Sequence, residues 1–186
     1  MKKLSLCLAT IALGLLGLAA PLTAAEKTED QLIKELDSPN ADIVASAMLK
    51  IEKQFPTSTK SFPKIKELLK DPRPKVHRKA ARVLGALHAE VSNDDLKAIT
   101  AMLKVTDAQE VMDALKALRG LKAESTVPEI LPLLKSSSPN VIRDACRALA
   151  VLGDKSTIPA LEPLLTHKDP AVQKDAQDAI HQLKAK

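Results

Sequence analysis

The chain has 186 residues and a formal net charge of +5, and aromatic residues make up only 1% of it, with two Phe, no Tyr and no Trp. A hydrophobic fraction of 45% excludes general disorder, and two cysteines exclude a disulfide-rich scaffold and a multi-cysteine zinc site. The shortage of aromatic side chains leaves little with which to stack a cofactor or a nucleic-acid base, so we expect no cofactor.

Residues 1–25 have the order of a secretory signal peptide. Two lysines near the start precede an uncharged apolar run over 4–20, and a proline and small residues follow up to Ala25. A positive start, a short apolar run and small residues at its end are typical of a signal that is removed. We therefore expect cleavage near Ala25, a periplasmic or secreted mature chain over 26–186, and no stable transmembrane segment after cleavage.

Two alternatives stay open for this segment. The apolar run over 4–20 is at the lower limit for a membrane-spanning helix of about 17–25 residues, and Cys7 faintly resembles a lipid-attachment cysteine. Cleavage removes Cys7 and two lysines but no acidic residue, so the mature chain keeps one cysteine, Cys146, and a net charge of +3. We expect Cys146 to be a buried thiol, with an exposed thiol open to intermolecular pairing as the alternative.

The rest of the chain is one unit repeated at a period of 31 residues. Stretches that begin at Leu96, Val127 and Ile158 align without a gap. An earlier copy begins at Phe62 with three additional residues, and a weaker copy precedes it. The alignment predicts five repeats, over about 29–58, 62–95, 96–126, 127–157 and 158–186.

Each repeat carries two apolar patterns with helical spacing. In the fourth repeat one lies over 127–134 and the other over 141–152, with a turn of serines and a proline over 136–139 between them. Prolines recur at two fixed positions, one before the second helix and one in the first turn of the first helix, where a missing N–H is tolerated. The positions are Pro74, Pro139 and Pro170, and Pro63, Pro128 and Pro159.

Two aligned columns turn polar only in the last repeat, at Gln177 and Gln182. The first column reads Met48, Ala81, Leu115, Cys146 and Gln177, and the second reads Ala86, Gly120, Val151 and Gln182. One hairpin cannot bury its apolar face alone, whereas stacked hairpins share a continuous core and need polar end repeats. We expect both columns to face the next repeat and the two glutamines to close the stack, which disfavours open-ended polymerisation.

The stretch over 71–85, Asp-Pro-Arg-Pro-Lys-Val-His-Arg-Lys-Ala-Ala-Arg-Val-Leu-Gly, resembles the second helix of HEAT repeats, closest to the short type named after bilin-lyase subunits. Residues 153–161 resemble the linker into the next repeat, and the resemblance covers about 29–186. It implies an all-α, right-handed α-solenoid of about five helical hairpins, with second helices on the concave side. Because the family serves mainly as scaffold and adaptor, the resemblance implies little about the specific function.

No catalytic or metal-binding pattern accompanies the repeats. The sequence has no G-x-S-x-G, no glycine-rich phosphate loop and no H-E-x-x-H. His77 and His88 are about three helical turns apart, too far to hold one metal, and we interpret them, with His167 and His181, as surface side chains. We therefore predict a non-enzymatic protein with no catalytic residue and no metal site.

Charged residues of the second helices form aligned columns. One mainly basic column reads Arg78, Met112, Arg143 and Lys174, and another reads Arg82, Lys116, Arg147 and Asp178. The column beside them reads Lys79, Asp113, Asp144 and Asp175 and is mainly acidic. Either the acidic column neutralises the basic ones in a solvated ladder, or the cations line a groove for an anionic or acidic partner. The predicted binding residues are Arg78, Arg82, Lys116, Arg143 and Arg147.

Charge is also uneven along the chain, because the segment over 60–88 has nine basic and two acidic residues. Such a segment suits an acidic protein or peptide, or anionic headgroups, and the export signal makes nucleic acid an unlikely partner. The leading hypothesis is an exported scaffold or adaptor that binds a protein or anionic partner through its second helices. The alternatives are an accessory subunit of an enzyme, like the bilin-lyase subunits, and a nucleic-acid-binding protein if the signal is not used.

Overall fold

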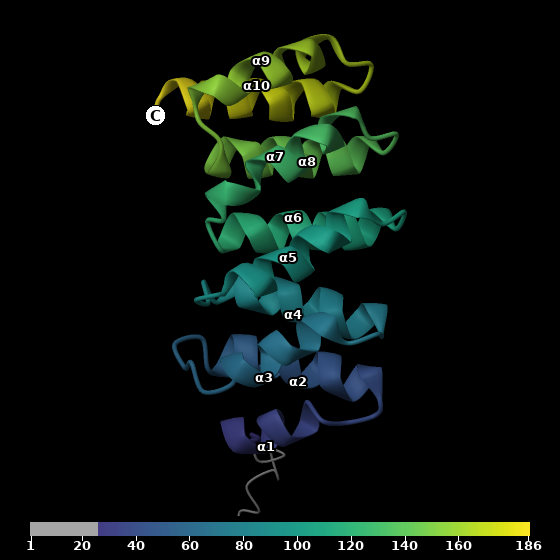
Figure 1. The fold of residues 1–186 in the computed structure, drawn as a ribbon, viewed down its shortest axis with the longest axis vertical. Coiled ribbons are helices and arrows are strands. Elements are labelled where there is room, and N and C mark those ends of the chain that lie inside the picture. Colours follow the sequence, from purple (N-terminus) through teal and green to yellow (C-terminus); the bar gives the residue numbers. More distant parts are fainter. Residues whose placement is uncertain (1–25) are drawn as a thin grey trace, which may run out of the picture.

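A computed structural model of the chain describes residues 26–186 as a stack of helices, with no strand among them (Figure 1). The predicted signal peptide over 1–25 and its cleavage site lie outside the described residues. No helix within 26–186 is long and apolar enough to cross a membrane.

Five helical hairpins follow one another along the stack, which confirms the predicted all-α solenoid. The first helices are α1 (Glu29–Glu35), α3 (Phe62–Glu67), α5 (Asn93–Ala101), α7 (Val127–Ile130) and α9 (Ile158–Leu161). The second helices are longer: α2 (Ala41–Gln54), α4 (Pro74–Ala86), α6 (Ala108–Gly120), α8 (Pro139–Leu152) and α10 (Pro170–Lys184).

The first helices of the last two repeats are short because each contains a second proline. Pro132 has no N–H to donate to the carbonyl four residues back, so α7 ends at Ile130 and the chain continues as a 3₁₀ turn over Leu131–Lys135. Pro163 has the same effect on α9, which continues as a 3₁₀ turn over Glu162–Thr166. These tight turns place the apolar stripe of each first helix against the second helix that follows.

Four of the second helices begin at a proline or directly after an N-capping aspartate. Proline is the first residue of α4, α8 and α10, where its missing N–H would have no helical partner in any case. α6 has no such proline, and the Asp107 carboxylate instead accepts hydrogen bonds from the backbone N–H groups of Gln109 and Glu110. α5 begins at Asn93, ahead of the expected Leu96, because Ser92 and Asp95 form a capping box there.

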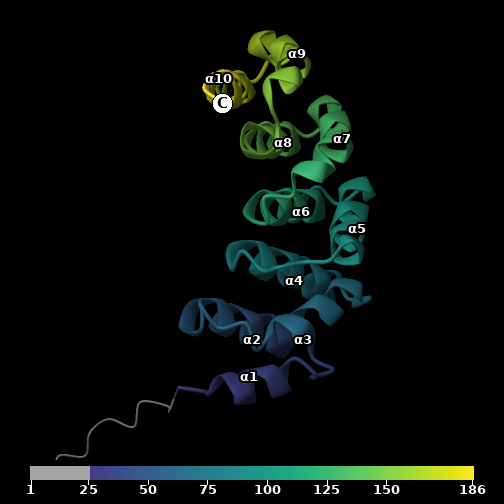
Figure 2. The same ribbon diagram turned by 60° about the vertical axis from the view of Figure 1, so that its left-hand side comes forward.

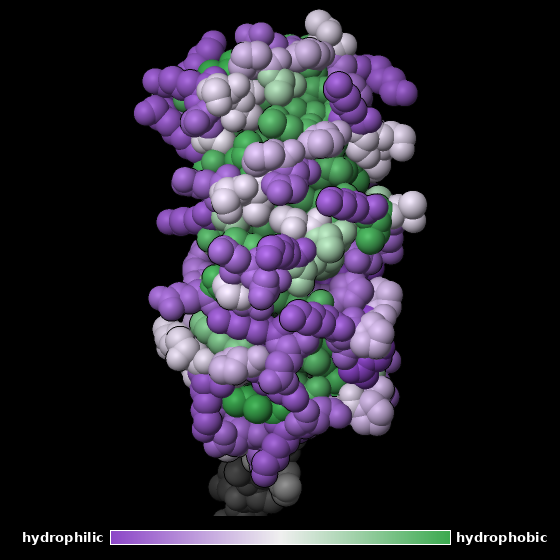
Figure 3. Space-filling view, in the orientation of Figure 1, coloured by the Kyte–Doolittle hydropathy of each residue, from purple (hydrophilic) through white to green (hydrophobic). Residues whose placement is uncertain are grey.

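The stack is curved, and all five second helices lie along its inner side (Figure 2). This arrangement agrees with the concave position that the family resemblance implies. The core lies between the two layers and consists mainly of Leu, Ile, Val and Ala. On the face shown in Figure 3, polar side chains separate the hydrophobic surface into small areas. Burial of apolar side chains between the two layers and between successive repeats stabilises the fold.

One of the two columns predicted to face the next repeat does so. Met48, Ala81, Leu115 and Cys146 are at most 1% exposed, and Gln177 at the end of the column is exposed. The prediction for the second column was wrong for Ala86 and Val151, which are exposed, and Gly120 packs against Gly85 of the preceding repeat and not against the next one. That column lies five residues further along each helix, a rotation of about 140°, which turns it away from the next repeat.

α6 ends in a left-handed residue that is not glycine. Lys122 has φ of 53°, the N–H of Ala123 donates to Leu118 O, and the N–H of Lys122 donates to Arg119 O. This is the Schellman pattern, in which glycine is the usual left-handed residue because it lacks a Cβ. His88 ends α4 in the same way, with φ of 50°.

Replacing Lys122 by glycine is expected to stabilise the protein by about 0.5–1 kcal/mol, because it removes the steric cost of the left-handed conformation. Urea unfolding followed by circular dichroism measures the change. Lys104→Gly is the control, since only His88 and Lys122 have positive φ among the described non-glycine residues, and it is expected to lower stability. A loss of stability in Lys122→Gly would contradict the prediction.

Candidate functional site

Three aspartates lie nearly buried between consecutive second helices on the inner side of the stack. The side chains of Asp113, Asp144 and Asp175 are 5%, 9% and 12% exposed. They occupy equivalent positions on α6, α8 and α10, and each receives basic side chains from the preceding repeat. A carboxylate buried to this degree needs a partner charge, because desolvation alone disfavours its ionised form.

Asp113 is contacted by both basic residues predicted on α4. Arg78 Nε lies 3.3 Å from Asp113 Oδ2, at an angle that does not make a hydrogen bond, and Arg82 Nε lies 3.9 Å from Asp113 Oδ1. Arg78 also reaches Asp107, with Nη1 3.5 Å from Oδ2. Within the same helix, Gln109 donates a hydrogen bond of 3.2 Å to Asp113.

The other two aspartates share Arg147. Lys116 Nζ lies 3.6 Å from Asp144 Oδ2, and Arg147 Nη1 lies 3.3 Å from Asp144 Oδ1. Arg147 Nη2 is also 3.0 Å from Asp175 Oδ2, while Arg143 Nε donates to the same oxygen at 2.8 Å. The hydrogen bond to Asp175 raises the pKa of Arg143 above its ordinary value. We call this set of ion pairs the Arg–Asp ladder; it comprises Arg78, Arg82, Asp113, Lys116, Arg143, Asp144, Arg147 and Asp175.

The ladder brings all five predicted binding residues together on the inner side, and each is paired with an aspartate of the next repeat. The ladder interpretation therefore describes the geometry. Its cations are nevertheless accessible to solvent on this inner surface. The side chains of Arg82, Lys116 and Arg147 are 42–44% exposed, whereas the carboxylates that they contact are nearly buried. A partner at this surface would contact half-exposed cations that ion pairs hold in place. Binding through these cations stays a prediction.

The column of Arg82, Lys116 and Arg147 reaches both ends of the stack, through Asp178, which the sequence alignment already placed in it, and through Leu49, which it did not. Leu49 on α2 is 36% exposed and occupies the equivalent position in the first repeat, and Asp178 on α10 is exposed and occupies it in the last. Leu49 did not figure in the sequence prediction because the first repeat is degenerate. The sequence did contain a signal for this position, because Leu49 directly follows Met48 just as Arg82 follows Ala81 in the alignment.

A pocket of about 290 Å³ opens beside the C-terminal end of the ladder. Arg119, Arg147 and Asp178 line it together with Val151, which is 41% exposed. Arg119 makes no ion pair with any described residue, and the sequence prediction did not include it. The pocket thus adds an apolar side chain and a further cation to the inner surface.

Six of the nine basic residues over 60–88 are neutralised by ion pairs within the fold. The pairs reach back to Asp30, Asp37 and Asp42 of the first repeat, or forward to Asp107 and Asp113 of the third, or stay local. Lys66, Lys70 and Lys79 make no ion pair within 26–186. The pKa of Lys79 is lowered, mainly because the side chain is partly buried and also because the positive charge of Arg82 lies nearby. The segment is therefore expected to attract anionic headgroups less strongly than the net charge of its sequence predicts.

His77 was expected at the surface, and that prediction was wrong. Its side chain is 16% exposed, with Nδ1 2.9 Å from Asp71 O and Nε2 3.0 Å from Glu110 Oε1. The histidine thus joins the second repeat to the nearly buried Glu110 of the third. The described part of the chain contains no group of three or more His, Cys, Asp or Glu side chains placed to hold a metal.

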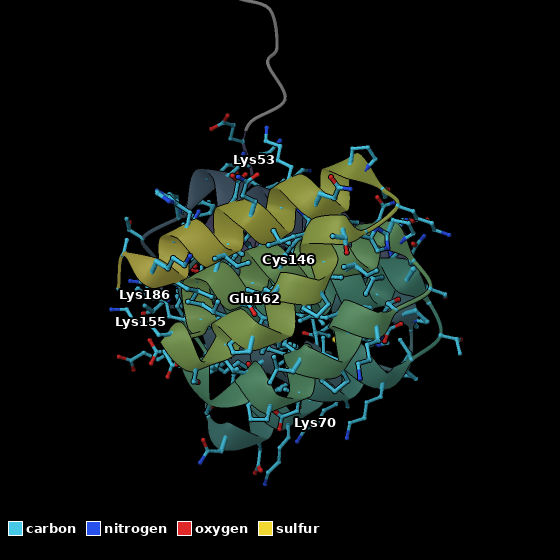
Figure 4. All side chains as sticks on the ribbon, turned by 90° about the horizontal axis from the view of Figure 1, so that it is seen from above. Lys53, Lys70, Cys146, Lys155, Glu162 and Lys186 are labelled. Atoms are coloured by element: carbon cyan, nitrogen blue, oxygen red, sulfur yellow. The ribbon has the colours of Figure 1, made fainter. Side chains whose placement is uncertain are left out.

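Cys146, a residue of α8, lies near the centre of the stack when viewed along its long axis (Figure 4), and it is fully buried. Burial raises the pKa of its thiol to about 12. We therefore expect no reaction with a thiol reagent at pH 8 in the folded protein, and full reaction after unfolding, because the thiolate is the nucleophile. Rapid modification without loss of circular dichroism would contradict this and restore the exposed-thiol alternative.

Comparison with solved structures gives the same architecture. The fold is similar to a chain of the complex of CpcE and CpcF of phycocyanin lyase from Nostoc sp. PCC7120, with a TM-score of 0.74, 21% identity, and coverage of 90% of this chain and 69% of that one. It is also similar to computationally designed armadillo repeat proteins for modular peptide recognition, with a TM-score of 0.59, 20% identity, and coverage of 82% and 80%.

The sequence comparisons assign the family. A search of the curated proteins found no match. The family model for HEAT repeats matches residues 29–119 and 113–181, which together include almost all of the described chain. The helical hairpins, their stacking and this match together show that the chain belongs to the HEAT-repeat family.

Proposed function

We propose that this protein is an exported, non-enzymatic scaffold that binds a protein or peptide partner through the inner surface of its second helices. The observation that carries the proposal is the row of half-exposed cations, Arg82, Lys116 and Arg147, held by nearly buried aspartates. Ion pairs that fix the cations before binding reduce the side-chain entropy lost on association. The similar designed armadillo proteins recognise peptides, which supports a binding role for this shape.

The experiment is affinity capture of partners from envelope extracts by the mature chain, compared with a variant that lacks the row. The variant combines Arg82→Gln, Lys116→Gln and Arg147→Gln with Asp144→Asn, because Asp144 would otherwise lose both of its cations. Asp113 and Asp175 keep Arg78 and Arg143. Capture is expected to fall at least tenfold while the circular dichroism spectrum is unchanged.

A control variant with the same change in net charge, Lys66→Gln with Lys70→Gln, removes two cations from the first-helix side of the second repeat. Neither lysine pairs with a described acidic residue, so the control is expected to fold and to capture the partner normally. Equal capture by wild type and the row variant would overturn the inner surface as the binding site. Equal loss in both variants would show that net charge alone controls capture.

A second candidate function is an accessory subunit of an enzyme. The similarity to a phycocyanin lyase chain, which covers 90% of this chain, favours it. In this case the captured partner is an enzyme subunit, and adding the purified chain is expected to raise that enzyme's activity. The scaffold proposal expects capture with no such effect on activity.

Export is tested separately, because it depends on residues 1–25. N-terminal sequencing of the chain purified from the producing cell is expected to begin at or near Glu26, in the periplasmic or extracellular fraction. Recovery of the uncleaved chain from the cytoplasm would contradict export and would make nucleic acid a partner to test.

A further inference from the structure

One exposed column crosses the whole inner surface, with one residue from each repeat. In chain order it reads Leu49, Arg82, Lys116, Arg147 and Asp178, that is, apolar, basic, basic, basic and acidic. All five residues are at least about one-third exposed. The column lies next to the buried column of Met48, Ala81, Leu115 and Cys146, so its register in the stack is fixed by packing.

The side chains of this column point to the inner side. On α4, Arg82 lies about 160° around the helix from Ala80 and from Leu84, which belong to the fully buried core. The ion pairs to Asp113, Asp144 and Asp175 hold the three cations in place. Packed helices are about 8–10 Å apart, so the five residues form an ordered series with one position about every 8–10 Å.

We propose that this column recognises an extended acidic peptide in the polyproline II conformation, with one side chain read by each repeat. A polyproline II helix has three residues per turn and rises about 9.3 Å per turn, so every third side chain points the same way at the spacing of the repeats. A β-strand does not fit, because residues three apart point to opposite faces. The proposal rests on the inner surface being the binding site.

The ends of the column set the register of the peptide. Leu49 favours an apolar residue, the three cations favour carboxylates, and Asp178 favours a basic residue. The peptide is therefore expected to carry an apolar residue, three acidic residues and one basic residue, in that order and each three positions apart. Asp178 would repel a fourth carboxylate, which limits the acidic stretch to the three central repeats.

The test is fluorescence anisotropy with labelled thirteen-residue peptides that have proline and serine at the spacer positions. The in-register peptide carries Leu, Glu, Glu, Glu and Lys at every third position, and is made in both chain directions. A scrambled peptide has the same composition with its glutamates adjacent. The in-register peptide, in one direction, is expected to bind about tenfold more tightly than the scrambled one, from three surface ion pairs.

The variant Asp178→Lys tests the register without touching the ladder, because Asp178 makes no ion pair with a described residue. It is expected to favour a peptide that ends in Glu over the one that ends in Lys by about threefold or more, the reverse of wild type. This reversal with an unchanged circular dichroism spectrum supports the proposal. An unchanged preference would overturn the register.

Three other results would overturn the proposal and leave the proposed function standing, provided that capture still depends on Arg82, Lys116 and Arg147. The first is equal binding of the in-register and scrambled peptides. The second is tighter binding of an α-helical peptide with its carboxylates seven residues apart, a spacing of about 10.5 Å. The third is no binding of any acidic peptide. Loss of dependence on the three cations would instead overturn the proposed function as well.

Discussion

Gly120→Ala is expected to lower the free energy of unfolding by about 2–3 kcal/mol, although alanine is normally the better helix former by about 1 kcal/mol. A Cβ at position 120 would lie 2.3 Å from Gly85 O and 2.7 Å from Gly85 C. These are backbone atoms of α4, so relief requires α4 and α6 to move apart. His88 Nδ1 also lies 2.7 Å from Gly120 O, which shows how closely the two repeats approach.

Urea unfolding followed by circular dichroism measures this loss. The control is Val151→Ala, which changes the equivalent residue of the next repeat, where the side chain is 41% exposed. Its effect is expected to be within about 0.5 kcal/mol, as for other surface substitutions. A stabilised Gly120→Ala protein would show that helix propensity outweighs the close contact between the repeats.

Removing both cations from Asp113, in Arg78→Ala with Arg82→Ala, is expected to cost about 3 kcal/mol of stability. The Asp113 side chain is 5% exposed, and its remaining hydrogen bond to a side chain comes from Gln109 at 3.2 Å. A nearly buried carboxylate without its counter-charge is strongly destabilising. The stability is measured by urea unfolding at neutral pH.

Adding Asp113→Asn to this double variant is expected to recover at least half of the lost stability, because the amide is neutral and nearly isosteric. Asp178→Asn is the matched control, since Asp178 is exposed and makes no ion pair within residues 26–186, and its effect is expected to be small. No recovery with Asp113→Asn would indicate that the arginines contribute through packing of their aliphatic stems.

The aligned columns of charge could be read from the sequence, but their pairing could not. Periodicity placed Arg82, Lys116 and Arg147 in one column and Asp113, Asp144 and Asp175 in the next. Periodicity could not predict whether the aspartate side chains are exposed next to the basic side chains or buried under them. Their exposure depends on how each helix is rotated in the stack. The same uncertainty explains the second apolar column, in which Ala86 and Val151 are exposed.

Contacts between repeats were also beyond the sequence. His77 resembled a surface histidine, and only the placement of α6 against α4 brings Glu110 to 3.0 Å from its ring. The net charge of the 60–88 segment was correct as arithmetic but misleading as a surface property. Its cations lie close to acidic residues about thirty positions away in sequence, as in the pairs of Lys64 with Asp37 and Arg78 with Asp107.

The sequence by itself determined the architecture, because a fixed period of apolar stripes, turns and prolines admits stacked helical hairpins and little else. The same short hairpins pack on Leu, Ile, Val and Ala, which accounts for the shortage of aromatic residues. Tertiary structure alone decided which charges are exposed. Stacking places the carboxylates between consecutive second helices and leaves the cations on the inner surface, and this difference in depth cannot be read from a linear chain.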